Sequence, residues 1–413
     1  MVLSLEVGLG PAAGASGARG GWENAERRNA VVTGAVPLRG ATAGRARPTP
    51  DERPSVDPFT PLTAGDLELP NRVVMAPMTR LRADEKGVPG ALIAEHYAQR
   101  ASLGLIISEG VFPSAESKGY AGQPGIETAE QAEGWRVVAD AVHAAGGRIV
   151  MQVMNAGRVS HTAITGTDRI VAPSAIAIDG EVRVPGDDKA RFPVPHALTT
   201  EELAVVRDEF VAAARRAVDA GFDGVEVHSA NGYLLHEFLS PVSNVRTDAY
   251  GGSPAARAAF PIEVTRAIAD EIGAGRVGIR ISPSHNIQDV LETDDDDVRA
   301  TYEALVDGLA PLGLSYLSVL HAEPAGELVQ DLRSRFGGVL IANSGFGSPT
   351  TRDEVRSLIA DGHADAVAVG RPVMANPDLV ERWQGGHPEN ELDQATVYAS
   401  GAEGYTDYER LPV

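Results

Sequence analysis

From residue 57 onward, short runs of Val, Ile, Leu and Ala alternate with longer stretches in which apolar residues recur at helical spacing. This alternation is typical of repeated strand–helix units that build a parallel sheet. It predicts eight strands, at 72–76, 104–108, 148–152, 224–228, 277–281, 316–320, 339–342 and 366–369. The helical stretches lie at 91–101, 131–145, 200–220, 256–272, 296–310, 326–336, 351–361 and 377–384.

Eight strands with eight helices match the (β/α)8 or TIM barrel, which we expect as a single α/β domain over residues 55–413. A doubly wound open sheet is the alternative, because the same alternation builds it. Closure is favoured because the chain has no strong dinucleotide-binding fingerprint. One helix start supports the segmentation, since Thr199 and Glu202 have the spacing of a capping box.

The acidic run Asp294 to Asp297 resembles a cluster of metal ligands. It directly precedes a helical pattern, where carboxylates face the positive end of the helix dipole. We therefore interpret the run as a helix start and predict no metal site.

Residues 1–54 are rich in Gly, Ala, Pro and Arg and show no sustained period, so we interpret them as a disordered or mis-annotated extension. Gly8-Leu9-Gly10 superficially resembles a dinucleotide-binding turn, but no helix opens after it. Arg27-Arg28 resembles the start of a twin-arginine export signal, yet the apolar stretch that follows is short. We expect neither function.

The formal net charge is −21, from 57 acidic and 36 basic residues, so the chain should repel nucleic acid. It has no cysteine, which excludes disulfides, thiolate catalysis and Cys-ligated zinc or iron–sulfur clusters. No apolar run reaches the roughly 18 residues of a membrane helix. We expect a soluble cytoplasmic protein, monomeric or homodimeric.

Barrel enzymes carry their chemistry at the carboxyl ends of the strands. Polar or glycine residues follow these ends here: Thr79, Gly110, Gln152, His228, Arg280, Ser344 and Arg371. The last two loops contain Ser344-Gly345 and Gly370-Arg371, which suit a phosphate held by backbone amides and a guanidinium. This predicts a cofactor that carries a phosphate.

The fourth strand ends in the spacing His228-x-x-Asn231-x-Tyr233. Two hydrogen-bond donors and a phenol together can polarise a carbonyl group and protonate the carbon beside it. A lone histidine would more often be an ordinary buried residue, but the combination favours a site. Arg280 could instead serve a buried ion pair, since a charge inside a strand needs a partner.

In these residues the chain resembles the Old Yellow Enzyme family of flavin-dependent ene-reductases. The resemblance covers about residues 57–410 and depends on several motifs in a fixed order. These motifs are at 69–80, 157–161, 228–233, 244–253, 369–372 and 376–380.

The resemblance implies a barrel that binds FMN non-covalently. Thr79 would lie near the reactive N5 of the flavin, Gln152 at its pyrimidine edge, and Arg280 beside N1 and O2, where charge gathers on reduction. The other expected cofactor-binding residues are Ala76, Pro77, Gly110, Ser344, Gly345, Gly370 and Arg371.

It further implies that His228 and Asn231 donate to the oxygen of an activated alkene, while hydride from the flavin adds to the β-carbon. Tyr233 would protonate the α-carbon. NADPH or NADH would reduce the flavin from the same pocket, in a ping-pong cycle. Two other functions stay open: a non-catalytic flavin-binding barrel, and a cofactor-independent lyase or isomerase.

Two positions depart from the near part of this family. Met154 stands where a Trp is common, and Asn155 where a His is frequent, which leaves the shape of the substrate open. Tyr398 matches a tyrosine that lines the substrate pocket, although a packing role fits equally well. We expect Met154 and Tyr398 to contact substrate. Arg246, Asp248 and Tyr250 should only hold the loop after the fourth strand.

Overall fold

A closed barrel of eight parallel strands forms the centre of the computed structural model, which describes residues 56–186 and 188–412. The strands are β3 (Val73–Met75), β4 (Leu105–Ile107), β5 (Ile149–Val153), β10 (Gly224–Ser229), β11 (Val277–Ile281), β12 (Tyr316–Leu320), β13 (Val339–Asn343) and β14 (Ala366–Val369). The predicted TIM barrel is confirmed. The predictions for residues 1–54, Gly8-Leu9-Gly10 and Arg27-Arg28 fall outside the described residues.

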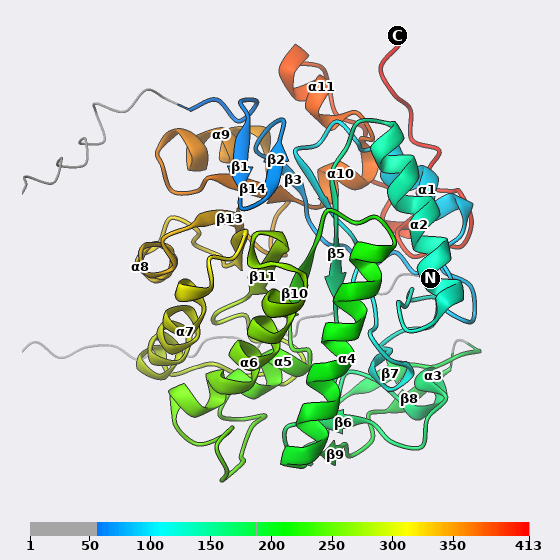
Figure 1. Cartoon of the computed structure of the whole chain (residues 1–413). Helices are drawn as coiled ribbons and strands as arrows, with labels where there is room; N and C mark the ends of the chain where they lie inside the picture. Colours follow the sequence, from blue (N-terminus) through cyan, green and yellow to red (C-terminus); the bar gives the residue numbers. More distant parts are fainter. Residues whose placement is uncertain (1–55, 187, 413) are drawn as a thin grey trace, which may run out of the picture. The chain divides into compact units, whose positions relative to one another are not determined.

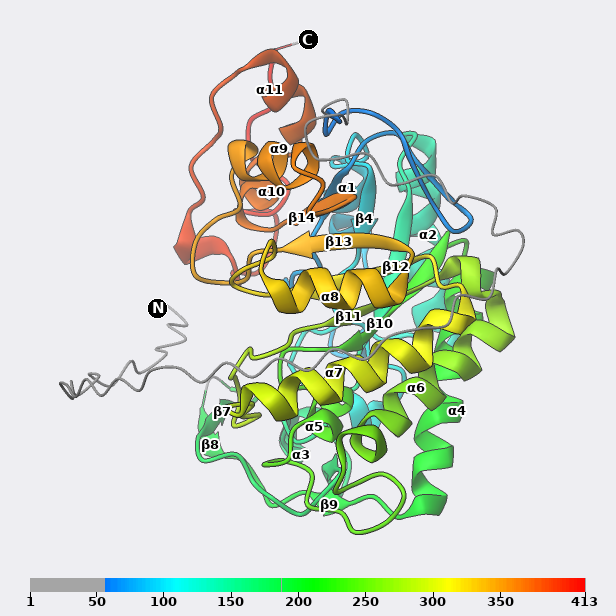
Figure 2. The same cartoon turned by 90° about the vertical axis from the view of Figure 1, so that its left-hand side faces the viewer.

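The helices lie around the outside of the strands, as Figures 1 and 2 show. All eight predicted helices are present with slightly shifted ends: α1 (Ala91–Ala98), α2 (Ala129–Ala144), α4 (Thr200–Asp219), α6 (Pro254–Ile272), α7 (Asp295–Leu309), α8 (Glu327–Phe336), α9 (Arg352–Ala360) and α11 (Leu379–Gly385). Thr199 and Glu202 form the predicted capping box of α4. The side chain of Asp294 caps α7, which confirms the helix-start interpretation.

Several short elements escaped prediction because segments of two to six residues are too short to show a period. They are the hairpin β1 (Leu62–Ala64) and β2 (Leu67–Leu69), the helices α3 (Thr162–Thr165), α5 (Leu234–Leu239) and α10 (Arg371–Ala375), the strands β6 (Val171–Ala172), β7 (Glu181–Arg183), β8 (Lys189–Arg191) and β9 (His196–Ala197), and the 3-10 helices η2 (Ala115–Ser117), η3 (Ala274–Arg276), η4 (Ala310–Leu312) and η5 (Gln394–Thr396). The segment between β5 and α4, at the lower right of Figure 1, contains α3 and β6 to β9.

Alternate residues of the strands fill the inside of the barrel. The end of the barrel that the β1–β2 hairpin closes is apolar. Leu67 and Leu69 of the β1–β2 hairpin join one buried cluster with strand residues such as Val150 and Tyr316. Gly278 leaves the space that Tyr316 occupies, because a Cβ there would lie 2.2 Å from the Tyr316 ring. Polar side chains are concentrated at the opposite end, where the carboxyl ends of the strands lie.

A second, larger cluster of buried residues fills the space between the strands and the surrounding helices, with Trp135 and Phe210 among its members. The amphipathic pattern of the helices is thus explained by packing against the outside of the barrel. Among the described residues, no helix has the length and apolar character that a membrane span requires.

The loop after the fourth barrel strand is held by Arg246, Asp248 and Tyr250, as predicted. Arg246 Nε donates to Asp248 Oδ1 at 3.0 Å, and Tyr250 OH donates to Glu263 Oε2 on α6 at 2.9 Å. These contacts fix the chain that leads away from the fourth strand.

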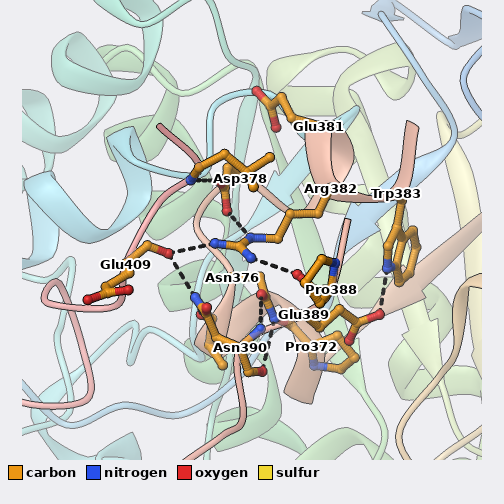
Figure 3. Close-up of polar contacts among 12 residues, drawn as sticks. Pro372, Asn376, Asp378, Glu381, Arg382, Trp383, Pro388, Glu389, Asn390 and Glu409 are labelled. Atoms are coloured by element: carbon orange, nitrogen blue, oxygen red, sulfur yellow. Dashed lines mark hydrogen bonds and ion pairs between the residues drawn. The ribbon is translucent and has the colours of Figure 1, made fainter. Parts of the chain in front are cut away.

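The C-terminal segment after α11 is tied to α11 by a group of polar contacts (Figure 3). Arg382 Nε donates to Asp378 Oδ1 at 2.6 Å, and its Nη2 donates to the Glu409 carbonyl at 2.8 Å. Asn390 Nδ2 donates to the same carbonyl at 2.8 Å. The segment that contains Tyr398 is therefore anchored at both ends.

Tyr405 connects this segment to the loop that follows β3. Its ring stacks on His96 with centroids 3.9 Å apart, and the Arg82 guanidinium lies 4.5 Å from the ring centroid. Arg80 Nη2 donates to the Gly404 carbonyl at 2.9 Å. The loop that contains Thr79 is thereby packed against the C-terminal segment.

His96 should make the stability of the fold depend on pH. It is fully buried, and burial lowers its pKa well below the usual value. The unfolded chain binds a proton near pH 6.5 that folded His96 does not bind. His96 therefore costs stability as the pH falls below about 6.5, by at most ~1.4 kcal/mol per pH unit. We expect the stability advantage of the wild type over His96→Gln to shrink between pH 7 and pH 5, measured by urea unfolding.

The single-residue comparison is necessary because other groups act in the opposite direction. Burial raises the pKa of Glu237 to about 8, so this carboxyl costs stability as the pH rises from about 4.5 to 8. A difference between wild type and His96→Gln that is constant with pH would refute the assignment of a neutral His96.

Candidate functional site

Strand register brings His228 and Arg280 side by side at the carboxyl end of the barrel. His228 pairs with Arg280 on β11, and Arg280 pairs with Ser318 on β12. Arg280 Nη1 donates to Ser318 Oγ at 3.3 Å and Nη2 donates to Asn343 Oδ1 at 3.2 Å. Its Nε is buried and has no partner among the described residues. The guanidinium thus keeps a free donor beside His228.

Glu226 is a site residue that the sequence reasoning missed. It pairs in register with Gln152, and Gln152 Nε2 donates to Glu226 Oε1 at 2.8 Å. Burial raises the pKa of Glu226, while the nearby charge of Arg280 opposes that shift. The sequence could have indicated this role, because Glu226 lies two residues before His228 and alternate strand residues share a face.

His228 is 3% exposed, and its Nδ1 has no partner among the described residues. Burial lowers the pKa of His228 well below the usual value, and the charge of Arg280 lowers it further. The imidazole is therefore neutral at pH 7. A neutral imidazole can still donate one N–H to an oxygen without bringing a second buried charge.

Asn231 lies in a turn with a left-handed backbone, φ 58°. Its N–H donates to Ser282 Oγ at 2.9 Å, and its carbonyl accepts from Gln288 Nε2 at 3.1 Å. Gly232 N–H donates to His236 Nδ1 at 2.9 Å. These bonds hold the turn in place, and the side-chain Oδ1 of Asn231 has no hydrogen-bond partner among the described residues.

Tyr233 is 8% exposed, and its ring lies 5.2 Å from that of His228 between centroids. Its hydroxyl is 2.7 Å from the hydroxyl of Tyr120. Tyr398, 45% exposed, lies close enough to add to the raised pKa of Tyr233, which is caused mainly by burial. The structure therefore brings Tyr398 to the same end of the barrel as Tyr233.

Met154 packs in a small buried cluster with Tyr233, against the partly buried ring of Tyr120. A Cβ at Gly110 would lie 2.6 Å from Met154 Sδ, so a glycine is required there for this packing. Gly110 and Met154 are thus neighbours, although one follows β4 and the other β5. The position that departs from the family lies directly beside the phenol.

Asn155, the second departure, has a structural role. Its Oδ1 accepts from Gly157 N–H at 2.9 Å, and its carbonyl accepts from Leu234 N–H at 3.1 Å. The side chain is 3% exposed. These contacts hold the segment around Gly157 against the start of α5.

The loop after β3 brings Ala76, Pro77 and Thr79 to the same end of the barrel. Ala76 N–H donates to the Val369 carbonyl at 3.0 Å, which joins the loop to β14. Glu109 Oε2 accepts from the backbone N–H groups of Arg80 at 3.0 Å and Leu81 at 3.1 Å. Glu109 therefore fixes the chain immediately after Thr79, a role that the sequence reasoning missed.

The loops after β13 and β14 bring the predicted phosphate-binding residues together, because these strands are paired. Arg371 Nη2 donates to the Phe346 carbonyl at 2.7 Å. Ser344 Oγ lies 3.2 Å from Thr350 Oγ1, and Gly345 has φ 91°, which favours glycine. The guanidinium of Arg371 thus lies against the Gly345 loop.

These residues fit an FMN. Buried polar groups normally have a hydrogen-bond partner, so the unpartnered Arg280 Nε, His228 Nδ1 and Asn231 Oδ1 indicate that a polar ligand belongs here. The Arg280 guanidinium and the Gln152 amide suit the flavin pyrimidine ring, and the Ser344–Gly345 and Gly370–Arg371 segments suit its phosphate.

Comparisons with known proteins agree with this fit. Residues 57–390 match the family described as "NADH:flavin oxidoreductase / NADH oxidase family". The chain is 42% identical to a probable flavin mononucleotide-dependent alkene reductase of Leishmania infantum, over 84% of this chain and 96% of the relative.

Two solved structures are similar as well. Morphinone reductase in complex with tetrahydroNAD is 43% identical, with a TM-score of 0.79 over 86% of this chain and 98% of that one. An Old Yellow Enzyme homologue from Zymomonas mobilis is 35% identical, with a TM-score of 0.81 over 86% of this chain and 100% of that one.

Proposed function

The chain belongs to the NADH:flavin oxidoreductase / NADH oxidase family, and from that premise we propose an FMN-dependent ene-reductase. It moves a hydride from NADPH or NADH to the activated C=C bond of α,β-unsaturated carbonyl or nitro compounds. One observation carries the proposal: two potential donors, His228 and Asn231, lie beside the phenol of Tyr233 and the buried cation of Arg280.

FMN, when bound, carries the hydride between the nicotinamide and the alkene. Arg280 would supply a positive charge to the pyrimidine ring, and Gln152, whose amide donates to Glu226, would bind its edge. Thr79, in the loop that Glu109 holds, would lie near the reactive part of the ring. The remaining residues that would hold the cofactor are Ala76, Pro77, Gly110, Ser344, Gly345, Gly370 and Arg371.

His228 and Asn231 donate hydrogen bonds to the carbonyl or nitro oxygen of the substrate. They stabilise the negative charge that develops there as the β-carbon gains a hydride. A well-placed donor of this kind typically contributes about 3–4 kcal/mol to the transition state. The turn that contains Asn231 is bonded through its backbone, so this donor is pre-organised.

Tyr233 supplies the proton. Burial raises its pKa above the usual value near 10, so the phenol is protonated at neutral pH. Its O–H bond breaks as a C–H bond forms at the α-carbon of the substrate. Met154 and Tyr398 line the same space and contact the substrate.

The nicotinamide uses the same pocket before the alkene does. Morphinone reductase, a similar barrel, has been solved in complex with tetrahydroNAD, which is consistent with a nicotinamide as a ligand of this fold. A ping-pong cycle follows, since the two substrates share one site. A flavin carrier without turnover would need neither the donors nor the phenol, and a lyase would need no flavin.

We also propose that residues 55–413 form the catalytic domain, with 1–54 as an extension. The net charge of −21 supports an enzyme without a nucleic-acid partner. We further propose that the protein is cytoplasmic and is a monomer or a homodimer.

The test starts from the purified holoenzyme. We expect it to be yellow, to release FMN on heating, to bleach with NADPH under anaerobic conditions and to regain colour with an α,β-unsaturated ketone. A colourless protein would exclude both flavin-dependent functions. A flavin that bleaches but is reoxidised by no enone, nitroalkene or maleimide would exclude the ene-reductase alone.

A further inference from the structure

Two tyrosines from distant parts of the chain meet at the site. Tyr120 lies in the loop between β4 and α2, and Tyr233 follows β10, yet their hydroxyl oxygens are 2.7 Å apart. Either hydroxyl can be the donor in this geometry. Which one donates decides whether the proton of Tyr233 is free for a substrate.

The environments of the two phenols favour Tyr120 as the donor. Burial raises the pKa of Tyr120 well above the usual value, and the neighbouring Tyr233 raises it further. For Tyr233, burial raises the pKa but the hydrogen bond with Tyr120 lowers it. Tyr120 therefore keeps its proton while Tyr233 is the more acidic member of the pair.

Proton transfer from Tyr233 leaves a negative charge in a buried place. The electron pair of the broken O–H bond stays on the phenolic oxygen until water returns a proton. A buried charge is costly unless it accepts hydrogen bonds. Tyr120 is the side chain whose hydroxyl already lies at hydrogen-bond distance from that oxygen.

We infer that Tyr120 is a positioning residue, whose hydroxyl donates to the Tyr233 oxygen, directs the Tyr233 proton to the substrate α-carbon and stabilises the resulting phenolate. This inference rests on the proposed function. Gln288 is the second member of the arrangement: its Nε2 donates to the Asn231 carbonyl at 3.1 Å, and its side chain interacts with both phenols. The proton donor and the carbonyl-binding turn are thereby linked.

The ring of Tyr120 has a separate packing role, which makes the hydroxyl testable by itself. It packs against a buried cluster that contains Met154, Val159 and Tyr233. Phenylalanine preserves that packing and removes only one oxygen. Tyr250→Phe is the matched control, because it removes a hydroxyl that is bonded to Glu263 on α6.

The experiment compares wild type, Tyr120→Phe, Tyr233→Phe, the double variant and Tyr250→Phe as holoenzymes, in separate half-reactions with NADPH and with cyclohexenone. We expect Tyr120→Phe to slow flavin reoxidation by ~10- to 100-fold, the range for a hydrogen bond to a charged group, and to leave flavin reduction nearly unchanged. In the Tyr233→Phe background, Tyr120→Phe should add no further slowing.

Equal slowing of both half-reactions, or the same slowing with and without the Tyr233 hydroxyl, would overturn the inference. A second measurement does not depend on turnover. With tyrosine labelled at the ring carbon that bears oxygen, we expect Tyr120→Phe to shift the NMR signal assigned to Tyr233, and Tyr250→Phe to leave it in place. An unshifted signal would refute the contact, whereas a wild type that reduces no alkene but shows the shift would refute only the proposed function.

Discussion

Tyr233→Phe should slow reoxidation of the reduced enzyme by an activated alkene by about 10²- to 10⁴-fold, the usual contribution of a general acid. Flavin reduction by NADPH should stay close to the wild-type rate, because hydride transfer to the flavin requires no proton from this phenol. The ring of Tyr233 is 8% exposed and packs against Met154, so phenylalanine fills the same space. Stopped-flow absorbance of the flavin measures both half-reactions in one preparation.

The control for this prediction is Tyr250→Phe, which removes a hydroxyl that is bonded to Glu263 on α6. We expect a much smaller effect, because Tyr233 is next to the two carbonyl donors and Tyr250 only holds the loop after the fourth strand. If Tyr233→Phe slowed flavin reduction as much as reoxidation, the phenol would not be the proton donor. If it changed neither half-reaction, the proton would come from elsewhere.

Arg280→Met should destabilise the folded chain and weaken FMN binding. Arg280 is 2% exposed, and its charge opposes the burial-induced rise in the pKa of Glu226. The two charges interact without a direct salt bridge among the described residues, so we expect a cost below the ~3–5 kcal/mol typical of a contacting buried ion pair. Urea unfolding of the FMN-free protein measures this loss, and fluorescence titration with FMN measures the affinity.

A double variant separates the two effects of Arg280. Arg280→Met with Glu226→Gln removes both buried charges, so we expect it to recover much of the stability lost in the single variant. FMN affinity and the flavin reduction potential should stay low, because the cation beside the pyrimidine ring is still missing. Recovery of the potential together with the stability would mean that Arg280 serves only the Glu226 pair.

Much of the site could be predicted because its residues come from strand ends. The order of β5, β10 and β11 around the barrel follows from parallel strands with helical connections, so His228, Arg280 and Gln152 had to gather at one rim. Glu226 could also have been predicted as a site residue, since it shares a strand face with His228. The sequence does not show, however, that its partner is Gln152.

Tyr120 and the role of Glu109 could not be predicted in this way. Tyr120 contacts Tyr233 across 113 residues through a loop whose path no period describes. Glu109 accepts from the backbone of Arg80 and Leu81, and such contacts leave no mark on the side-chain pattern. The same holds for the C-terminal segment, whose position depends on Arg382, Asp378 and Asn390.

The sequence by itself determined the eight strand–helix units and the residues at the strand ends, and it favoured closure into a barrel, because these depend on local periodicity and on the geometry of parallel strands. Only the tertiary structure decided how those residues are supported: the carboxylate of Glu226 behind Gln152, the bonded turn at Asn231 and the phenol of Tyr120 against Tyr233. Those contacts join loops and strands far apart in the chain, and their distances depend on how the whole barrel packs.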